Sequence, residues 1–153
     1  MPPIHNPRIA LDGIILRLDP GSKRCYPGTG TSVTELVSGR TGTMSGGVTV
    51  NSSGEFVFDG TDDRIDMGNS YINQSEFTMS QANSHYTLEA WIYVETSQGT
   101  TTSADSIIGN TSSIGVGMQV GESGGLPRVN FAARSTSNFY SSTFNYNEWV
   151  HVV

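Results

Sequence analysis

Positive charge, cysteine and long apolar runs are all scarce in this sequence, and each shortage excludes a class of protein. Eight Lys and Arg stand against 14 Asp and Glu, which gives a formal net charge of −6. No basic cluster exceeds the Lys23–Arg24 pair, so we expect no nucleic-acid partner. No apolar run approaches the roughly 20 residues that cross a bilayer, so we expect no membrane insertion. Cys25 has no second cysteine to pair with, and packing must therefore hold the fold.

The first ten residues differ from the rest of the chain. Residues 1–10 contain three prolines and show no alternation of apolar and polar side chains. Proline fixes φ and removes a backbone donor, so we expect an extended N-terminal arm. The arm either docks on another subunit or is a disordered terminus. Residues 11–153 are expected to form one domain.

Strong helix formers are also scarce, whereas 18 glycines and many Ser, Thr and Asn favour turns. The clearest periodicity covers residues 86–95. Leu88 and Ile92 lie on one face of this stretch, while Glu89, Trp91 and Tyr93 lie on the other. A helix would scatter these residues, so the period of two predicts a strand.

Shorter segments with the same alternation are spread along the chain between turn residues. We predict strands over residues 13–19, 48–50, 55–58, 64–67, 106–109, 115–120, 128–134, 139–144 and 149–153. Residues 71–84 and 98–105 are predicted to be surface loops, and residues 34–37 a single helical turn that ends at Gly39. This pattern predicts an all-β fold.

Five segments in a fixed order resemble a known family. They are residues 13–19 (GIILRLD), 25–31 (CYPGTGT), 56–63 (FVFDGTDD), 86–92 (YTLEAWI) and 148–153 (EWVHVV). Together they resemble the laminin-G-like, concanavalin A-like lectin domain over roughly residues 11–153. The opening strand with its Tyr-Pro-Gly-Thr-Gly-Thr sequence is similar to versions in structural proteins of tailed phages. The resemblance implies an antiparallel β-sandwich of two sheets with a jelly-roll arrangement.

The chain departs from the family pattern at two positions and at its end. Val33 stands where an aromatic residue is usual, and Glu35 stands where Asp is usual. In the family, a hairpin and a returning strand follow the Trp-x-His-Val segment, and here Val153 is the last residue. We therefore expect a sandwich that lacks its C-terminal strands, with an open edge at residues 13–19. Either the sequence is a fragment or another chain supplies the missing strand by β-addition.

Catalytic chemistry is not expected. Glycosidases of this fold need two carboxyl groups about 5 Å apart, or about 6.5–9.5 Å apart, on one face. Glu95 is the next acid beyond Glu89 on the face that carries Trp91, and at about 3.3 Å per residue it lies about 20 Å away. Residues 121–125 fit Gly-x-Ser-x-Gly, but they join two predicted strands and are expected to form a hairpin.

Asp59, Asp62, Asp63 and Asp66 form the densest acidic group, and the first three are the candidate metal ligands. The resemblance implies calcium at the rim of the domain, where carboxylate oxygens are suitable ligands. The alternative, which we favour, is that these residues lie in turns and cap their own backbone. No other cofactor is expected.

Trp91 and Tyr93, with Glu89 beside them, are the candidate ligand or interface residues. The aliphatic face of their strand is the better candidate for the core, so we expect the aromatic face to be exposed. Exposed aromatics at alternate positions could stack on sugar rings or enter a protein interface.

The first functional hypothesis is a non-enzymatic structural or adhesion component of a phage virion, such as a fibre, appendage or decoration subunit. Its partners would be other virion proteins or copies of itself, reached through the N-terminal arm and the open sheet edge, with a host-surface glycan as a further partner. It would be assembled in the host cytoplasm and located in the virion. The alternative is a carbohydrate-binding module of a bacterial or extracellular surface protein.

Overall fold

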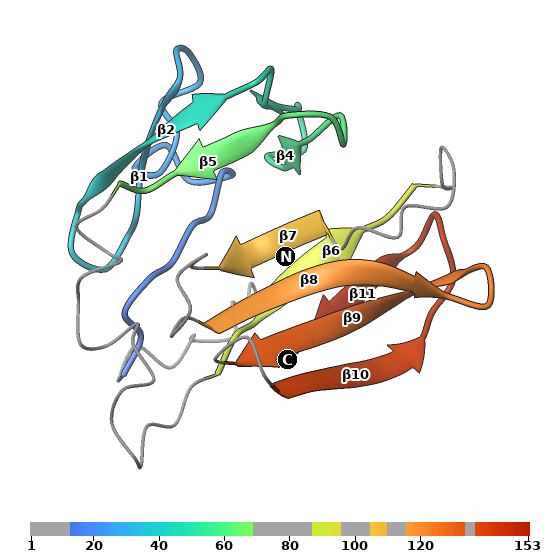
Figure 1. Cartoon of the computed structure of the whole chain (residues 1–153). Coiled ribbons are helices and arrows are strands. Elements are labelled where there is room, and N and C mark those ends of the chain that lie inside the picture. Colours follow the sequence, from blue (N-terminus) through green and yellow to red (C-terminus); the bar gives the residue numbers. More distant parts are fainter. Residues whose placement is uncertain (1–12, 69–86, 96–104, 110–115, 134–136) are drawn as a thin grey trace, which may run out of the picture. The chain divides into compact units, whose positions relative to one another are not determined.

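The computed structural model describes residues 13–68, 87–95, 105–109, 116–133 and 137–153 (Figure 1). These residues form antiparallel strands and no helix, which confirms the all-β prediction. Within the described part of the chain there is accordingly no helix of the length and apolarity that would span a membrane. The chain divides into two compact units, residues 1–68 and 69–153. The predicted arm (1–10), the predicted loop over 71–84 and residues 98–104 of the predicted loop over 98–105 lie outside the described residues.

The first unit contains one three-stranded sheet and one short hairpin. The sheet has the order β1-β2-β5, with β1 at Ser32–Thr34, β2 at Thr41–Ser45 and β5 at Arg64–Asp66. The hairpin pairs β3 (Thr49–Val50) with β4 (Phe56–Val57). The strands predicted over 48–50, 55–58 and 64–67 are therefore confirmed, with shorter bounds.

The core of the first unit is small and is built from alternate positions. Val33, Met44 and Val48 are buried together, and six partly buried side chains pack against them: Leu18, Tyr26, Val50, Phe56, Ile65 and Met67. Gly42, between two exposed threonines of β2, is buried because β5 lies close to it. An added Cβ there would come within 2.9 Å of the Asp66 carbonyl oxygen, so this position requires glycine.

Two parts of the first unit differ from the sequence prediction. Residues 14–19 form no strand among the described residues, although Leu18 packs on the core and the Arg17 carbonyl accepts a hydrogen bond from Leu36 N at 2.9 Å. The predicted helical turn is instead the end of β1 followed by a turn over residues 36–38. Gly39 has a φ of 78°, so the expected chain reversal at this glycine is present.

The second unit contains a four-stranded sheet and a two-stranded ribbon. The sheet has the order β10-β9-β8-β7, with β7 at Asp105–Gly109, β8 at Val116–Ser123, β9 at Leu126–Ala133 and β10 at Ser137–Thr143. The ribbon pairs β6 (Ala90–Tyr93) with β11 (Trp149–Val152). The five predicted strands that correspond to β7 to β11 are confirmed, and the strand over 86–95 is shorter than predicted.

The sheet and the ribbon pack face to face as two layers of a β-sandwich (Figure 1). Met118 and Val129 of the sheet share one buried cluster with Val152 of the ribbon. Ala90, Ile92 and Val150 on the same side of the ribbon pack against this cluster, together with Leu88, Ile107, Ile108, Phe131 and Phe144. The sandwich expected from the alternation is thus present in this unit, and the jelly-roll connectivity stays a prediction.

The β8–β9 connection decides how the Gly-x-Ser-x-Gly match is to be interpreted. Ser123 pairs with Leu126, and Gly124 and Gly125 form a two-residue turn with φ values of 61° and 83°. Two successive positive φ angles are what a tight hairpin of this hand needs, and glycine adopts them without strain. The segment is a hairpin turn, as predicted, and has no helix after it.

Candidate functional site

The outer face of the β6–β11 ribbon carries most of the predicted ligand or interface residues. Val150 and Val152 pair with Ile92 and Ala90 and face the core. Because side chains alternate across a strand, the intervening residues point the other way. We call this group the aromatic face; it consists of Trp91, Tyr93, Trp149 and His151.

The aromatic face is open to solvent. Trp91 is 65% exposed, Tyr93 43% and Trp149 47%. The exposure of Trp91 and Tyr93, predicted from the alternation, is confirmed, whereas their role in binding stays a prediction. Moving large aromatic side chains out of water is energetically favourable. This face can therefore bury apolar area against a partner or ligand.

The four rings of the aromatic face form two cross-strand pairs. Trp91 stacks on His151 with ring centroids 4.9 Å apart and an interplanar angle of 24°. Tyr93 and Trp149 lie at 5.6 Å with a tilt of 53°. Directly opposed residues of an antiparallel pair are close enough for such contacts, which orient the rings before any ligand arrives.

Glu89 adds a carboxylate to the edge of the aromatic face. Its Oε1 lies 2.8 Å from His151 Nε2, and both side chains are exposed. The two residues are 62 positions apart, and no sequence signal near His151 indicates an acid. Only the β6–β11 register brings them together. No nucleophilic side chain contacts this pair within the part of the chain described, so the arrangement positions an imidazole and supplies hydrogen-bonding groups.

The candidate metal ligands also lie together. Asp59, Asp62 and Asp63 each offer one carboxylate oxygen, and these oxygens lie within 4.8 Å of one another. Asp63 Oδ1 is buried and has no hydrogen-bond partner among the described residues. Oxygen ligands at this spacing fit a hard divalent cation such as calcium, which the three carboxylates would hold by charge.

The same carboxylates cap the turn in which they lie. Asp63 Oδ2 accepts a hydrogen bond from Asp59 N at 2.8 Å, and Asp59 Oδ1 accepts one from Thr61 N at 2.8 Å. The favoured turn-capping interpretation is therefore confirmed for these two residues. Asp62 makes no hydrogen bond through its side chain among the described residues, so the two interpretations assign it different roles.

Glu35 is the charged residue whose importance the sequence interpretation missed. It is 0% exposed, and its carboxylate accepts hydrogen bonds from Val37 N (2.8 Å), Ser38 N (2.6 Å), Arg40 N (3.2 Å) and the Ser38 hydroxyl. Burial by itself would raise the pKa of Glu35, but the hydrogen bonds from Ser38, Val37 and Arg40 outweigh it and lower the pKa to about 2. All of these donors lie within five residues of Glu35, so this carboxylate organises the turn after β1.

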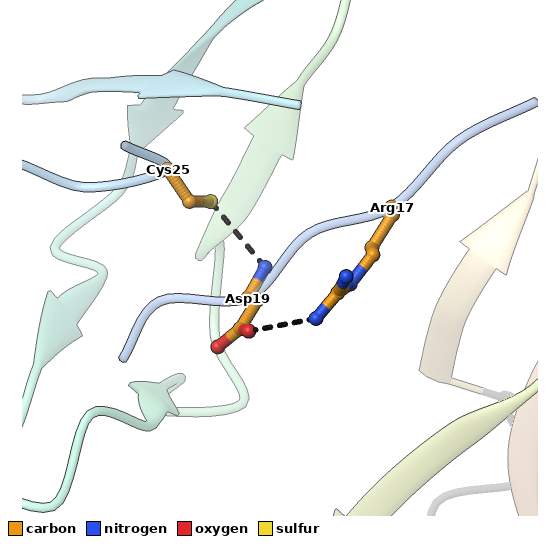
Figure 2. A network of polar contacts seen from close by, with 3 residues as sticks. All are labelled: Arg17, Asp19 and Cys25. Atoms are coloured by element: carbon orange, nitrogen blue, oxygen red, sulfur yellow. Dashed lines mark hydrogen bonds and ion pairs between the residues drawn. The ribbon is translucent and has the colours of Figure 1, made fainter. Parts of the chain in front are cut away.

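A second small network joins residues 17–19 to Cys25 within the first unit. Figure 2 shows Asp19 between Arg17 and Cys25: its carboxylate pairs with the Arg17 guanidinium at 3.1 Å, and its backbone N–H lies 3.4 Å from Cys25 Sγ. Cys25 is a free, buried thiol, and burial raises its pKa. A buried protonated thiol is unreactive, so Cys25 is a packing residue.

Comparison with known proteins identifies no relative of the chain. No family model, no curated protein and no solved structure matches it. The laminin-G-like, concanavalin A-like resemblance therefore stays a prediction that rests on the sequence segments quoted above. Among the described residues, the aromatic face is the group of exposed side chains best suited to contact a partner.

Proposed function

We propose that this chain is a non-enzymatic structural or adhesion component of a phage virion, such as a fibre, appendage or decoration subunit, and that it binds a neighbouring subunit through the aromatic face. The observation that supports the proposal best is the exposure of Trp91, Tyr93 and Trp149 on one side of a ribbon whose other side is core. Aromatic residues grouped on a surface are typical of protein interfaces, where Trp and Tyr supply much of the binding energy.

The arrangement of the aromatic face is better suited to binding a partner than to catalysis. The contacts within it are ring stacking and one hydrogen-bonded Glu89–His151 pair, which hold the rings in place. Side chains that are ordered before binding lose less entropy when a partner covers them. Glu95, the next acid in sequence on this face, is too distant along the strand to work with Glu89 as a glycosidase pair.

The virion setting is the part of the proposal that rests on sequence alone. Its support is the ordered set of segments described above, above all residues 13–19 and 25–31. The net charge of −6 favours protein partners or uncharged surfaces over nucleic acid. The proposed partners are other virion proteins or copies of the chain, with a host-surface glycan as a further partner.

The second candidate is a carbohydrate-binding module of a bacterial or extracellular surface protein. The proximity of Trp91 to the Glu89–His151 pair favours it, because a sugar could stack on the indole ring while its hydroxyl groups reach the carboxylate. This candidate needs a site that works in a monomer. The virion candidate needs a protein contact.

Light scattering on the purified chain, followed by a glycan array, separates the two candidates. The virion component is expected to self-associate, with at least tenfold weaker association in a Trp91→Ala, Trp149→Ala double variant. Phe139→Ala is the matched control, because Phe139 is also 65% exposed but lies on β10. A stable monomer that binds one class of glycan, and loses that binding in the double variant, would favour the carbohydrate-binding module instead.

A further inference from the structure

The aromatic face is a strip with an acidic residue at each end. Trp91 and Tyr93 alternate along β6 with residues that face the core, and Glu89 and Glu95 continue the same alternation before and after them. Both acids are exposed. At about 3.3 Å per residue, the strip is about 20 Å long from Glu89 to Glu95. A partner that covers this strip therefore needs apolar surface along its length and a basic group near one end.

The two tryptophans of the face also offer hydrogen-bond donors. Trp91 and Trp149 make the ring contacts described above, and neither indole N–H donates to another residue in the part of the chain that the structure describes. An indole N–H can only donate, so it needs an acceptor from the partner. A backbone carbonyl beside an apolar side chain supplies the acceptor and the apolar surface together.

The first ten residues of the chain have the chemistry that the strip lacks. Pro2, Pro3 and Pro7 are three of the six prolines in the chain, Arg8 follows them, and no Asp or Glu occurs before Asp12. A proline ring is apolar, and proline keeps its carbonyl acceptor but has no N–H that would need a partner. Surfaces lined by aromatic rings bind proline-rich segments in the extended polyproline II conformation for these reasons.

The length of the proline-rich segment matches the length of the strip. Residues 2–8 are separated by six steps of about 3.1 Å in polyproline II, which gives about 19 Å. Met1, Pro2 and Asn6 each precede a proline, and a residue in that position avoids the helical conformation. A segment restricted in this way loses little entropy when it binds a surface whose rings are already held in place.

We propose that the aromatic face binds residues 2–8 of a neighbouring copy of the chain. The proline rings rest on the aromatic rings, the indole N–H groups donate to carbonyl oxygens of the segment, and Arg8 lies beside the acid at one end of the strip. This inference rests on the proposed function, association through the aromatic face, and names its partner. Each copy offers one arm and one face, so the contact is head-to-tail and joins copies into a ring or a filament.

Tryptophan fluorescence tests the proposal directly, because the two tryptophans of the chain both lie on the aromatic face. We expect acrylamide quenching of the full chain to fall as its concentration rises, since the arm of a neighbouring copy covers the indole rings. Light scattering on the same samples should show association over the same range of concentration. Protection of the tryptophans at concentrations where the chain is a monomer would overturn the contact between copies.

A triple variant removes the proline rings without shortening the chain. Pro2→Ala, Pro3→Ala, Pro7→Ala is expected to raise the midpoint concentration of association roughly tenfold, and to leave the tryptophans open to acrylamide where those of the wild type are protected. If the triple variant associates as the wild type does, the arm is not what covers the face.

A charge reversal tests the placement of Arg8. Arg8→Glu should weaken association roughly threefold, with an effect that fades in high salt, because the acids of the strip would then repel the arm. Arg24→Glu makes the same change of charge at an exposed position of the first unit and should have no effect. Equal weakening by both variants would overturn the contact between Arg8 and the strip.

A synthetic peptide of residues 1–10 provides an independent test on the full chain. We expect it to compete with the arm, so that the assembly dissociates while the tryptophans stay protected. The same peptide with alanine at its three proline positions should leave the assembly intact. If both peptides act alike, or if neither acts, proline recognition by the face is wrong.

The double variant Trp91→Ala, Trp149→Ala distinguishes the failure of this inference from the failure of the proposed function. If it weakens association and the triple proline variant does not, the aromatic face is an interface but binds a different segment. If neither variant changes association, the proposed function falls together with the inference.

Discussion

Glu35 in the first unit and Glu89 in the second are both carboxylates that hold a neighbouring group, yet they work in opposite surroundings. Glu35 is fully buried and accepts its hydrogen bonds from three backbone N–H groups and a hydroxyl within five residues of itself. Glu89 is exposed, and its partner is one imidazole from a strand 62 residues away. A carboxylate surrounded by local donors builds a turn, whereas one that meets a distant side chain at the surface remains accessible to a ligand.

Asp63 lies between these extremes. One of its oxygens accepts a backbone hydrogen bond from Asp59, and the other is buried without a partner. Its contribution to the free energy of unfolding should therefore be intermediate. Four predictions test this ordering, from the largest expected effect to the smallest.

Replacing Glu35 with alanine should give the largest loss of stability. The change leaves three backbone N–H groups and the Ser38 hydroxyl without their acceptor, so we expect a loss of roughly 3–5 kcal/mol in the free energy of unfolding. Urea denaturation measures it. Glu95→Ala, at an exposed position, is the control and should change stability by less than about 0.5 kcal/mol. A similar small change in Glu35→Ala would show that the turn does not depend on this carboxylate.

Acid should weaken the first unit through the same residue. The pKa of Glu35 is lowered from 4.5 to about 2 in the folded chain. The stabilisation is therefore fully present above pH 4.5 and is lost as the pH falls through about 2, with a total on the order of 3 kcal/mol. Urea denaturation between pH 7 and pH 2 should show this loss in the wild type and a smaller one in Glu35→Gln. Parallel pH profiles for the two proteins would contradict the prediction.

The acidic turn should show a smaller effect, and one that does not require metal. Asp63→Ala removes an acceptor for Asp59 N and should cost about 1 kcal/mol, whereas Asp62→Ala should be close to neutral. Calcium prefers six to eight oxygen ligands, and the cluster supplies three carboxylates of which two act as caps. We therefore expect the melting temperature to be the same with calcium and with chelator. A rise with calcium that Asp62→Ala abolishes would establish a metal site instead.

Glu89→Gln should have the smallest effect on stability. The Glu89–His151 pair is exposed, and exposed pairs contribute less than about 1 kcal/mol. Thermal unfolding at low and high salt should show a small difference from the wild type that disappears in high salt. Quenching of Trp fluorescence by acrylamide should increase, because His151 would no longer be held over Trp91. A large loss of stability would show that the fold depends on Glu89 as it does on Glu35, and would contradict the contrast between them.

The sequence predicted the second unit better than the first, for a physical reason. In β8 and β9, apolar residues alternate with polar residues or glycine over several positions, as in residues 116–120 and 127–131. Strands β1 and β2 each carry too few apolar side chains to show a period, with Val33 and Met44 as their buried residues. Residues 14–19 alternate clearly but form no strand among the described residues. Alternation indicates which side chains share a face, but a strand also needs a second segment with which its backbone can pair.

The features of the candidate sites also differ in how far the sequence alone could predict them. Exposure of Trp91 and Tyr93 and the capping by Asp59 and Asp63 follow from neighbours within a few residues, so local reasoning reached them. The Glu89–His151 pair depends on which strands lie side by side. No local pattern contains that information.

By itself, the sequence determined that the chain is all-β, which face of each long strand is apolar, and where the tight turns fall, because these properties depend on side-chain period and on the backbone freedom of glycine. Only the tertiary structure decided which strands pair and in what register. Register is a property of two segments far apart in the chain, and a shift of one residue would have turned His151 and Trp91 to opposite faces.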